Sequence, residues 1–246
     1  MVYAVAIFIV LDLCCIRIWF EIRSKSEMLD IFSVWRISIM ENKFYRPELM
    51  RVRNKDVRSI LVKHRDLVGA REFIETGTYH GATVEMMIRE FDRIMSVDLS
   101  EKCLDIARIR VERQNRFGRI KGKSPAEVEL VLGNSLEVLP KFLDSLTGPC
   151  VFWLDAHYST DGEKLGYQDC TAFQELQIIL KHRSNIPASG DASSMAHAII
   201  IDDARFMGKG DYPSISQLVK EVREIKNRVR IKVDQDTVQI SPLIKE

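Results

Sequence analysis

The chain has 246 residues, of which 36 are basic and 35 acidic, and its formal net charge is +1. Apolar residues make up 46% and charged residues 29%, a balance that is typical of a globular protein and excludes wholesale disorder. The length favours one α/β domain with an appendage over two full domains. The near-neutral charge gives no argument for a nucleic acid or an anionic surface as partner.

The cysteines and the first residues bear on where the protein works. The five cysteines include no CxxC pair, which indicates reduced thiols of a cytoplasmic protein. Residues 1–20 are mostly apolar, and Asp12 is the one charged residue among the first sixteen. Membrane association through this segment is one interpretation. The uncharged run before Asp12 is shorter than the ~20 residues that a spanning helix needs, so a helix docked on the domain or on a second subunit is the alternative.

Three regions follow from the patterning along the chain. Residues 1–26 form the apolar N-terminal segment, and residues 27–68, with mixed charge and scattered apolar positions, predict a cap of two or three helices. Residues 69–246 alternate short apolar runs with amphipathic stretches. The runs predict strands at residues 72–75, 93–97, 128–132, 150–154 and 198–201, and the intervening helices are expected at 83–91, 101–113, 135–143 and 171–181.

This alternation predicts a doubly wound, Rossmann-like α/β domain whose mostly parallel sheet is covered by helices on both faces. Two further runs, residues 229–233 and 237–240, are joined by Asp234-Gln235-Asp236 and predict a C-terminal antiparallel hairpin. The expected sheet therefore has seven strands.

The first chemical signal is the segment ETGTYHGAT at residues 75–83. A strand ends in Glu75, a turn containing Gly77 and Gly81 follows, and a helix begins near Thr83. Glycines there allow a sharp turn and the close approach of a cofactor, although a purely structural turn has the same spacing. Neither the dinucleotide fingerprint GxGxxG nor the phosphate-binding GxxxxGK[ST] is present.

The second signal is Asp98, the last residue of the next strand in the segment IMSVD. A carboxylate at this place can accept both ribose hydroxyls of an adenosine cofactor. Asp98 is alternatively the N-cap of the helix that starts at Ser100.

With these segments, the chain from about residue 73 to 240 resembles the class I S-adenosylmethionine-dependent methyltransferases. ETGTYHGAT is similar to the first motif of that family, SVDLSEKCLDIAR to its second-strand motif, and VLGNSLEVLP to the segment that contacts adenine. The resemblance implies that Glu75, Gly77 and Gly81 border the methionine part of S-adenosylmethionine. It implies that Asp98 holds the ribose, and that Asn134 and Ser135 face the adenine.

Carboxylates follow two more predicted strands, in FWLDAH and IIIDDAR. Asp155, Asp202 and Asp203 would meet at the carboxyl edge of the sheet, where they repel one another unless a basic group or a cation compensates their charge, and a site rich in oxygen atoms suits Mg²⁺. The arrangement is similar to a branch of metal-dependent O-methyltransferases that act on sugars and other natural products, and it implies these three aspartates as metal ligands. By the same resemblance, His157 is the candidate base, and Asp155 and His157 are the candidate catalytic residues.

The sequence thus predicts a methyltransferase that uses S-adenosylmethionine, with Mg²⁺ assistance, to methylate a hydroxyl of a small-molecule acceptor. The alternative is a non-catalytic Rossmann-like binding protein tethered to a membrane or an oligomer. A nucleic-acid substrate is not expected, because the basic run at residues 108–123 is interrupted by Glu112 and is interpreted as a solvated helix end. Arg205 is expected either to pair with an aspartate or to bind an anionic substrate group, and Tyr158, Tyr167 and Tyr212 are expected to border the substrate pocket.

Overall fold

The computed structural model describes residues 47–118, 124–155, 171–209 and 212–243. The predicted N-terminal segment, residues 1–26, lies outside these ranges, as do residues 27–46 of the predicted helical cap. Nearly all of the described residues belong to one compact unit, Arg51–Glu246. The described end of the cap is a single helix, α4 (Pro47–Val68). Pro47 is its first residue, where the missing backbone N–H costs no helical hydrogen bond.

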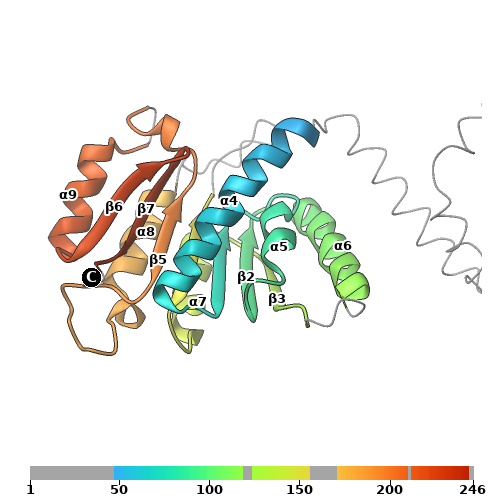
Figure 1. Ribbon diagram of the computed structural model, residues 1–246, viewed down its shortest axis with the longest axis horizontal. Coiled ribbons are helices and arrows are strands. Elements are labelled where there is room, and N and C mark those ends of the chain that lie inside the picture. The colour runs from blue at the N-terminus through green and yellow to red at the C-terminus, as the bar shows by residue number, and fades with distance from the viewer. Residues whose placement is uncertain (1–46, 119–123, 156–170, 210–211, 244–246) are drawn as a thin grey trace, which may run out of the picture. The chain divides into compact units, whose positions relative to one another are not determined.

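One seven-stranded sheet forms the centre of the domain, in the order β3-β2-β1-β4-β5-β7-β6. The strands are β1 (Glu72–Thr76), β2 (Arg93–Asp98), β3 (Glu127–Leu132), β4 (Cys150–Leu154), β5 (Ala198–Ile201), β6 (Val229–Asp234) and β7 (Thr237–Pro242). The first five are parallel, and β7 pairs antiparallel with both β5 and β6. This arrangement confirms the predicted doubly wound sheet with its C-terminal hairpin (Figure 1).

Helices connect the strands and cover both faces of the sheet (Figure 1). They are α5 (Ala82–Met87), α6 (Glu101–Gly118), α7 (Ser135–Ser145), α8 (Ala172–Lys181) and α9 (Ile215–Ile225), with short 3₁₀ turns at η2 (Arg183–Asn185) and η3 (Ala204–Phe206). Helix α9 was not predicted. Its start carries a capping box, in which Ser214 and Gln217 satisfy each other's backbone N–H groups.

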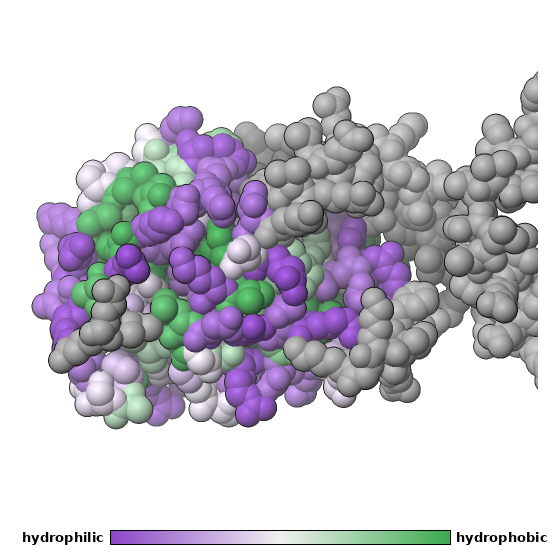
Figure 2. All heavy atoms as spheres, in the orientation of Figure 1, coloured by the Kyte–Doolittle hydropathy of each residue, from purple (hydrophilic) through white to green (hydrophobic). Residues whose placement is uncertain are grey.

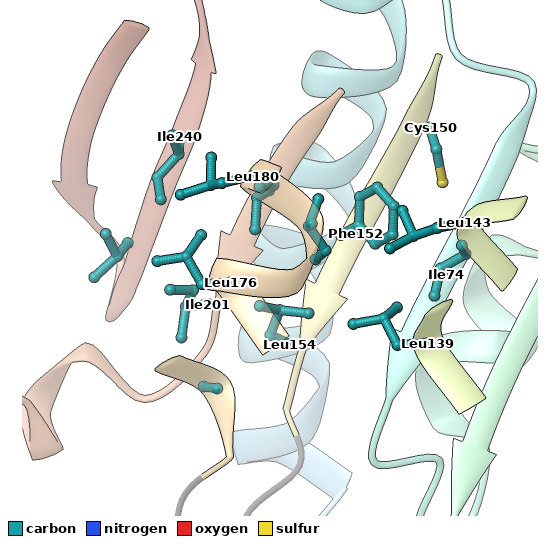
Figure 3. Packing of buried hydrophobic residues seen from close by; sticks show 14 of the residues in the cluster. Ile74, Leu139, Leu143, Cys150, Phe152, Leu154, Leu176, Leu180, Ile201 and Ile240 are labelled. Atoms are coloured by element: carbon teal, nitrogen blue, oxygen red, sulfur yellow. The ribbon is translucent and has the colours of Figure 1, made fainter. Parts of the chain in front are cut away.

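One hydrophobic cluster lies on each face of the sheet, because alternate residues of each strand point to opposite sides. On one side Phe73 and Trp153 pack with Ile60 and Leu61 of α4 and Val84 of α5. Figure 3 shows the other side, where core residues of the sheet face the helices. The labelled residues are Ile74, Cys150, Phe152, Leu154, Ile201 and Ile240 of the strands, Leu139 and Leu143 of α7, and Leu176 and Leu180 of α8.

Two tight turns with positive φ angles fix the ends of elements. Gly69 (φ 67°) ends α4, and the next N–H, that of Ala70, donates to the carbonyl of Arg65 at 2.9 Å, as in a Schellman motif. Gln235 (φ 49°) and Asp236 (φ 62°) form the two-residue turn of the hairpin, the mirror-image geometry that suits twisted strands. Asp236 is held there because its backbone carbonyl and its carboxylate accept the N–H groups of Ala204 and Arg205 at 2.8 Å each.

The visible surface is mainly hydrophilic, with small hydrophobic areas between the polar residues (Figure 2). Within the described ranges, no helix has both the length and the apolar composition to cross a membrane. The segment for which membrane association was predicted, residues 1–20, is outside those ranges.

Candidate functional site

The predicted site residues meet where the order of the strands reverses. From β1 the chain proceeds to β2 and β3 on one side, and β4 and β5 lie on the other. In an open α/β sheet, the crevice beyond the carboxyl ends of the strands at such a switch point is where ligands bind. The neighbouring strand ends are tied together here: the N–H of Asp155 donates to the carbonyl of Thr76 at 3.0 Å, and that of Asp202 to Leu154 at 3.1 Å.

The turn after β1 has the conformation that its glycines suggested. Gly77 and Gly81 have φ angles of 85° and 74°, which side chains strongly disfavour. Gly81 also lies where α5 meets α6, since a Cβ atom on it would stand 2.7 Å from the Cβ of Ala107. Gly77 is anchored to the neighbouring strand by its N–H, which donates to the carbonyl of Val97 at 2.9 Å. The two glycines therefore serve different needs, a sharp turn and a close helix contact.

Tyr79 occupies the position where the most glycine-rich form of the motif has another glycine. It adopts the left-handed region (φ 46°), its ring is exposed, and it stacks on His80 with ring centroids 3.8 Å apart. Its N–H donates to Oδ2 of Asp98 at 2.7 Å. The turn after β1 is thereby joined to the end of β2.

Asp98 is held by backbone groups on both carboxylate oxygens. Oδ2 accepts from Tyr79, and Oδ1 accepts the N–H of Ser100 at 2.8 Å. The helix itself begins at Glu101, and the hydroxyl of Ser100 accepts the N–H of Cys103 at 3.4 Å, so Ser100 rather than Asp98 is its capping residue. An ionised carboxylate offers about four acceptor positions, so these two bonds leave Asp98 able to accept further hydroxyl groups.

Two exposed leucines flank Asp98 and were not predicted from the sequence. Leu99 follows Asp98 directly and is 41% exposed. Leu132 of β3, which pairs with Asp98 in the sheet, is 51% exposed. Asn134 begins the next helix, where its Oδ1 accepts the N–H of Leu136 at 3.0 Å. An apolar surface between a carboxylate and a side-chain amide is the kind of surface that a flat, polar-edged base can cover.

Glu75 is fully buried at the end of β1. Ser96 donates to its Oε2 at 2.7 Å, and Ser96 is in turn within 2.7 Å of the hydroxyl of Thr78. Burial raises the pKa of Glu75 to about 8, and the charges of Asp155 and Asp98 act in the same direction, while the bonds from Ser96 and Thr83 oppose them. Glu75 is therefore mostly a neutral acid at pH 7.

The three predicted metal ligands lie together. One carboxylate oxygen from each of Asp155, Asp202 and Asp203 falls within 4.8 Å of the others, and Asp202 and Asp203 are buried. Arg205 contacts Oδ1 of Asp203 at 2.6 Å and also pairs with Asp236, so the ion pair expected for Arg205 is formed. Asp203 and Asp236 thus share one guanidinium. Carboxylate oxygens gathered as in Asp155, Asp202 and Asp203 are the ligands that suit a hard divalent cation.

Other predicted residues fall beside this site or outside the described ranges. His157, Tyr158 and Tyr167 belong to residues 156–170, which the structure does not describe. Tyr212 is partly buried and packs near Phe206, with ring centroids 5.8 Å apart. In the basic run, Arg110 and Arg113 both bind Glu85 of α5, at 2.8 and 2.5 Å, so these charges are used within the domain.

Sequence reasoning missed Glu175, which has no exposed surface and lies under the switch point in α8. It accepts hydrogen bonds from the hydroxyls of Thr76, Ser135 and Thr171. A signal was present: Glu175 lies three residues after Ala172 and four before Ile179, on the apolar face of the helix. A carboxylate within such a stripe indicates a buried polar network.

No protein-family model and no curated protein sequence matches the chain. Solved structures do match. The O-methyltransferase TomG from Streptomyces achromogenes, involved in tomaymycin synthesis and in complex with SAM, has a TM-score of 0.50 and 16% identity, over 77% of this chain and 80% of that one. The O-methyltransferase from Bacillus cereus, in complex with SAH, has a TM-score of 0.51 and 18% identity, over 91% and 93% of the two chains.

This chain has the Rossmann-like methyltransferase fold. At these identities the likeness concerns the fold, and the function has to be argued from the site.

Proposed function

We propose that the protein is an S-adenosylmethionine-dependent methyltransferase that methylates a hydroxyl of a small-molecule acceptor. The observation that carries the proposal is the position of Asp98, a carboxylate at the end of β2 joined through the N–H of Tyr79 to the glycine turn after β1. This junction lies at the carboxyl ends of β1 and β2, next to the switch point between β1 and β4 where an adenosine cofactor is bound in folds of this kind.

The surroundings of Asp98 fit the parts of the cofactor. Its remaining acceptor positions suit the two ribose hydroxyls. Leu99 and Leu132 offer apolar surface for the adenine, and the amide of Asn134 can bond to the edge of the base. The hydroxyl of Ser135 is directed to Glu175, so its contribution to adenine is its backbone N–H in the first turn of α7, which has no acceptor within the helix. The turn that contains Gly77 and Gly81 would border the methionine part.

Asp155, Asp202 and Asp203 would hold a divalent cation, for which Mg²⁺ is the expected ion. Their oxygen atoms are close enough to share one ion, and oxygen-only ligands match its preference. Arg205 lies 2.6 Å from Oδ1 of Asp203, so this carboxylate would be shared between the guanidinium and an ion.

The residues then divide the reaction between them. The bound cofactor supplies an electrophilic methyl group, and a divalent cation favours the deprotonated form of a nearby hydroxyl. Asp155 adjoins both parts of the site, because it belongs to the acidic cluster and its backbone N–H is bonded to the end of β1. His157, two residues further on, is the proposed base that removes the hydroxyl proton, a task that suits a neutral imidazole near pH 7. The acidic cluster and the paired arginines of α6 favour a small acceptor over a nucleic acid.

Calorimetric titration of the full-length chain with S-adenosylmethionine tests the cofactor proposal. We expect binding by the wild-type protein and about 10- to 100-fold weaker binding by Asp98→Asn, because the substitution removes charged acceptors of two hydroxyl groups. Asp92→Asn is the matched control, since Asp92 is exposed, precedes the same strand and pairs with Arg71. Folded wild-type protein that does not bind the cofactor would leave the non-catalytic alternative in its place.

A second titration with Mn²⁺, followed by the electron paramagnetic resonance signal of the free ion, tests the acidic cluster. We expect binding to the wild-type protein and its loss in Asp202→Asn, which keeps the ion pair of Asp203 with Arg205 in place. Equal binding by both proteins would assign the ion to another site.

A further inference from the structure

The carboxylate of Glu175 collects hydrogen bonds from three separate elements. Thr76 at the end of β1 donates to Oε2 at 2.9 Å, and Ser135, the first residue of α7, donates to Oε1. Thr171, directly before α8, donates to Oε1 at 2.8 Å. Each of these partners within the described ranges is a hydroxyl group.

The position of the partners relates this network to the cofactor site. Thr76 directly precedes Gly77, and its carbonyl accepts the N–H of Asp155 at 3.0 Å. Ser135 directly follows Asn134, the residue proposed to meet the adenine. One buried carboxylate therefore joins the strand end beside the methionine part to the helix start beside the adenine part.

The cost of burying this group argues for a purpose beyond filling space. Burial raises the pKa of Glu175, and the charge of Asp155 acts in the same direction against the three hydroxyl bonds. The helix positions around it, Ala172, Leu176 and Ile179, are all apolar and buried. A leucine at position 175 would continue that packing without a buried polar group.

We infer that Glu175 is a positioning residue for the cofactor, which fixes the distance between the turn after β1 and the start of α7 through Thr76 and Ser135. The inference rests on the proposed function and adds to it a residue that contacts no part of the cofactor. Binding sites lose affinity when the residues that support the contacting groups are no longer held by their own hydrogen bonds.

Glu72 offers a matched comparison within the same strand. It is buried at the opposite end of β1 and also makes three hydrogen bonds, two from Thr147 at 2.8 Å and one from Arg93 at 3.3 Å. Its network lies at the amino end of the strands, away from the proposed site. Loss of a buried carboxylate there should reduce stability and leave the cofactor site intact.

The experiment measures calorimetric affinity for S-adenosylhomocysteine in the full-length wild-type protein and in Glu175→Leu, Glu175→Gln and Glu72→Leu, with folding checked by circular dichroism. We expect Glu175→Leu to weaken binding about tenfold or more, and Glu175→Gln to restore it to within about threefold, because an amide oxygen still accepts two hydroxyl bonds. Glu72→Leu should bind S-adenosylhomocysteine with wild-type affinity even if it lowers the unfolding midpoint as much as Glu175→Leu does.

Equal affinity in wild type and Glu175→Leu would overturn the inference, and so would equal weakening by Glu175→Leu and Glu72→Leu. If Glu175→Leu does not fold, Thr76→Val removes one of the three bonds with little change of shape, and wild-type affinity in that variant would overturn the inference in the same way. Absence of binding by folded wild-type protein would instead refute the cofactor proposal and the inference with it.

Discussion

Glu75→Gln should stabilise the protein at neutral pH, which is unusual for a substitution in a buried polar network. The carboxyl group has an ordinary pKa of 4.5 and a pKa of about 8 in the folded protein, chiefly because it is buried. Between these values the unfolded chain has lost the proton and the folded protein keeps it. The contribution of Glu75 to the free energy of unfolding therefore has its full value below pH 4.5, and it decreases as the pH rises towards 8.

The magnitude follows from the width of this interval. Each pH unit above 4.5 costs about 1.4 kcal/mol, so at pH 7 the native carboxyl group costs about 3 kcal/mol relative to a group that does not titrate. Glutamine has nearly the same shape, and its amide oxygen can accept the bond from Ser96. Part of the gain is offset because the glutamine amide cannot reproduce every hydrogen bond of the protonated carboxyl group, at about 1 kcal/mol for a lost hydrogen bond. The expected net stabilisation at pH 7 is about 2 kcal/mol.

Urea unfolding of wild type and Glu75→Gln at pH 5, 7 and 8.5, followed by circular dichroism, measures this difference. The advantage of Glu75→Gln should be small or reversed at pH 5 and should grow with pH. A difference between the two proteins that does not change with pH would refute the reasoning, because the gain is attributed entirely to titration of this one group.

Three further substitutions test the packing and the titration of buried residues. Gly81→Ala should destabilise by about 2–4 kcal/mol in urea unfolding, since it adds overpacking against Ala107 to an unfavourable backbone conformation. Gly69→Ala, at a similar φ of 67° with no atom within 4 Å, should lose only about 1 kcal/mol, and equal losses would contradict the packing argument. His197→Gln should make the free energy of unfolding less dependent on pH in the acid range. Burial and the nearby charges of His182 and Lys226 lower the pKa of His197 from 6.5 to about 4. The wild type therefore loses up to about 3 kcal/mol of unfolding free energy as the pH falls through this interval. A thermal-unfolding profile between pH 7 and 4 that is the same in both proteins would contradict that assignment.

The sheet could be predicted from the sequence because its signals are local. Central strands buried on both faces appear as short apolar runs, as in residues 150–154. Helix α9 was missed although Ser214 and Gln217 form a capping box, a signal that stands in the sequence. The predicted helix at residues 83–91 ends earlier, at Met87.

The site was only partly predictable, for a related reason. Residues at strand ends are brought to one edge by the topology, so the meeting of Asp155, Asp202 and Asp203 followed from the strands alone. The bonds of Glu175 join residues that are 99 and 40 positions apart, and no local pattern specifies such pairs. The roles assigned to the acidic cluster and to His157 stay predictions until the titrations and a substrate are in hand.

The alternation of β1 explains why one strand end can carry so much of the site. Successive side chains point to opposite faces, so Glu75 is bonded to Ser96 on one side, while Thr76 is bonded to Glu175 on the other. The backbone that continues into Gly77 is thereby held from both faces by a buried acid. If this arrangement prepares the turn for a ligand, Glu75 and Glu175 should differ in what their loss does. Replacing the titratable group at position 75 relieves a titration penalty at one edge of the turn, whereas removing the acceptor at position 175 releases α7 as well, so the larger effect on cofactor binding belongs to Glu175.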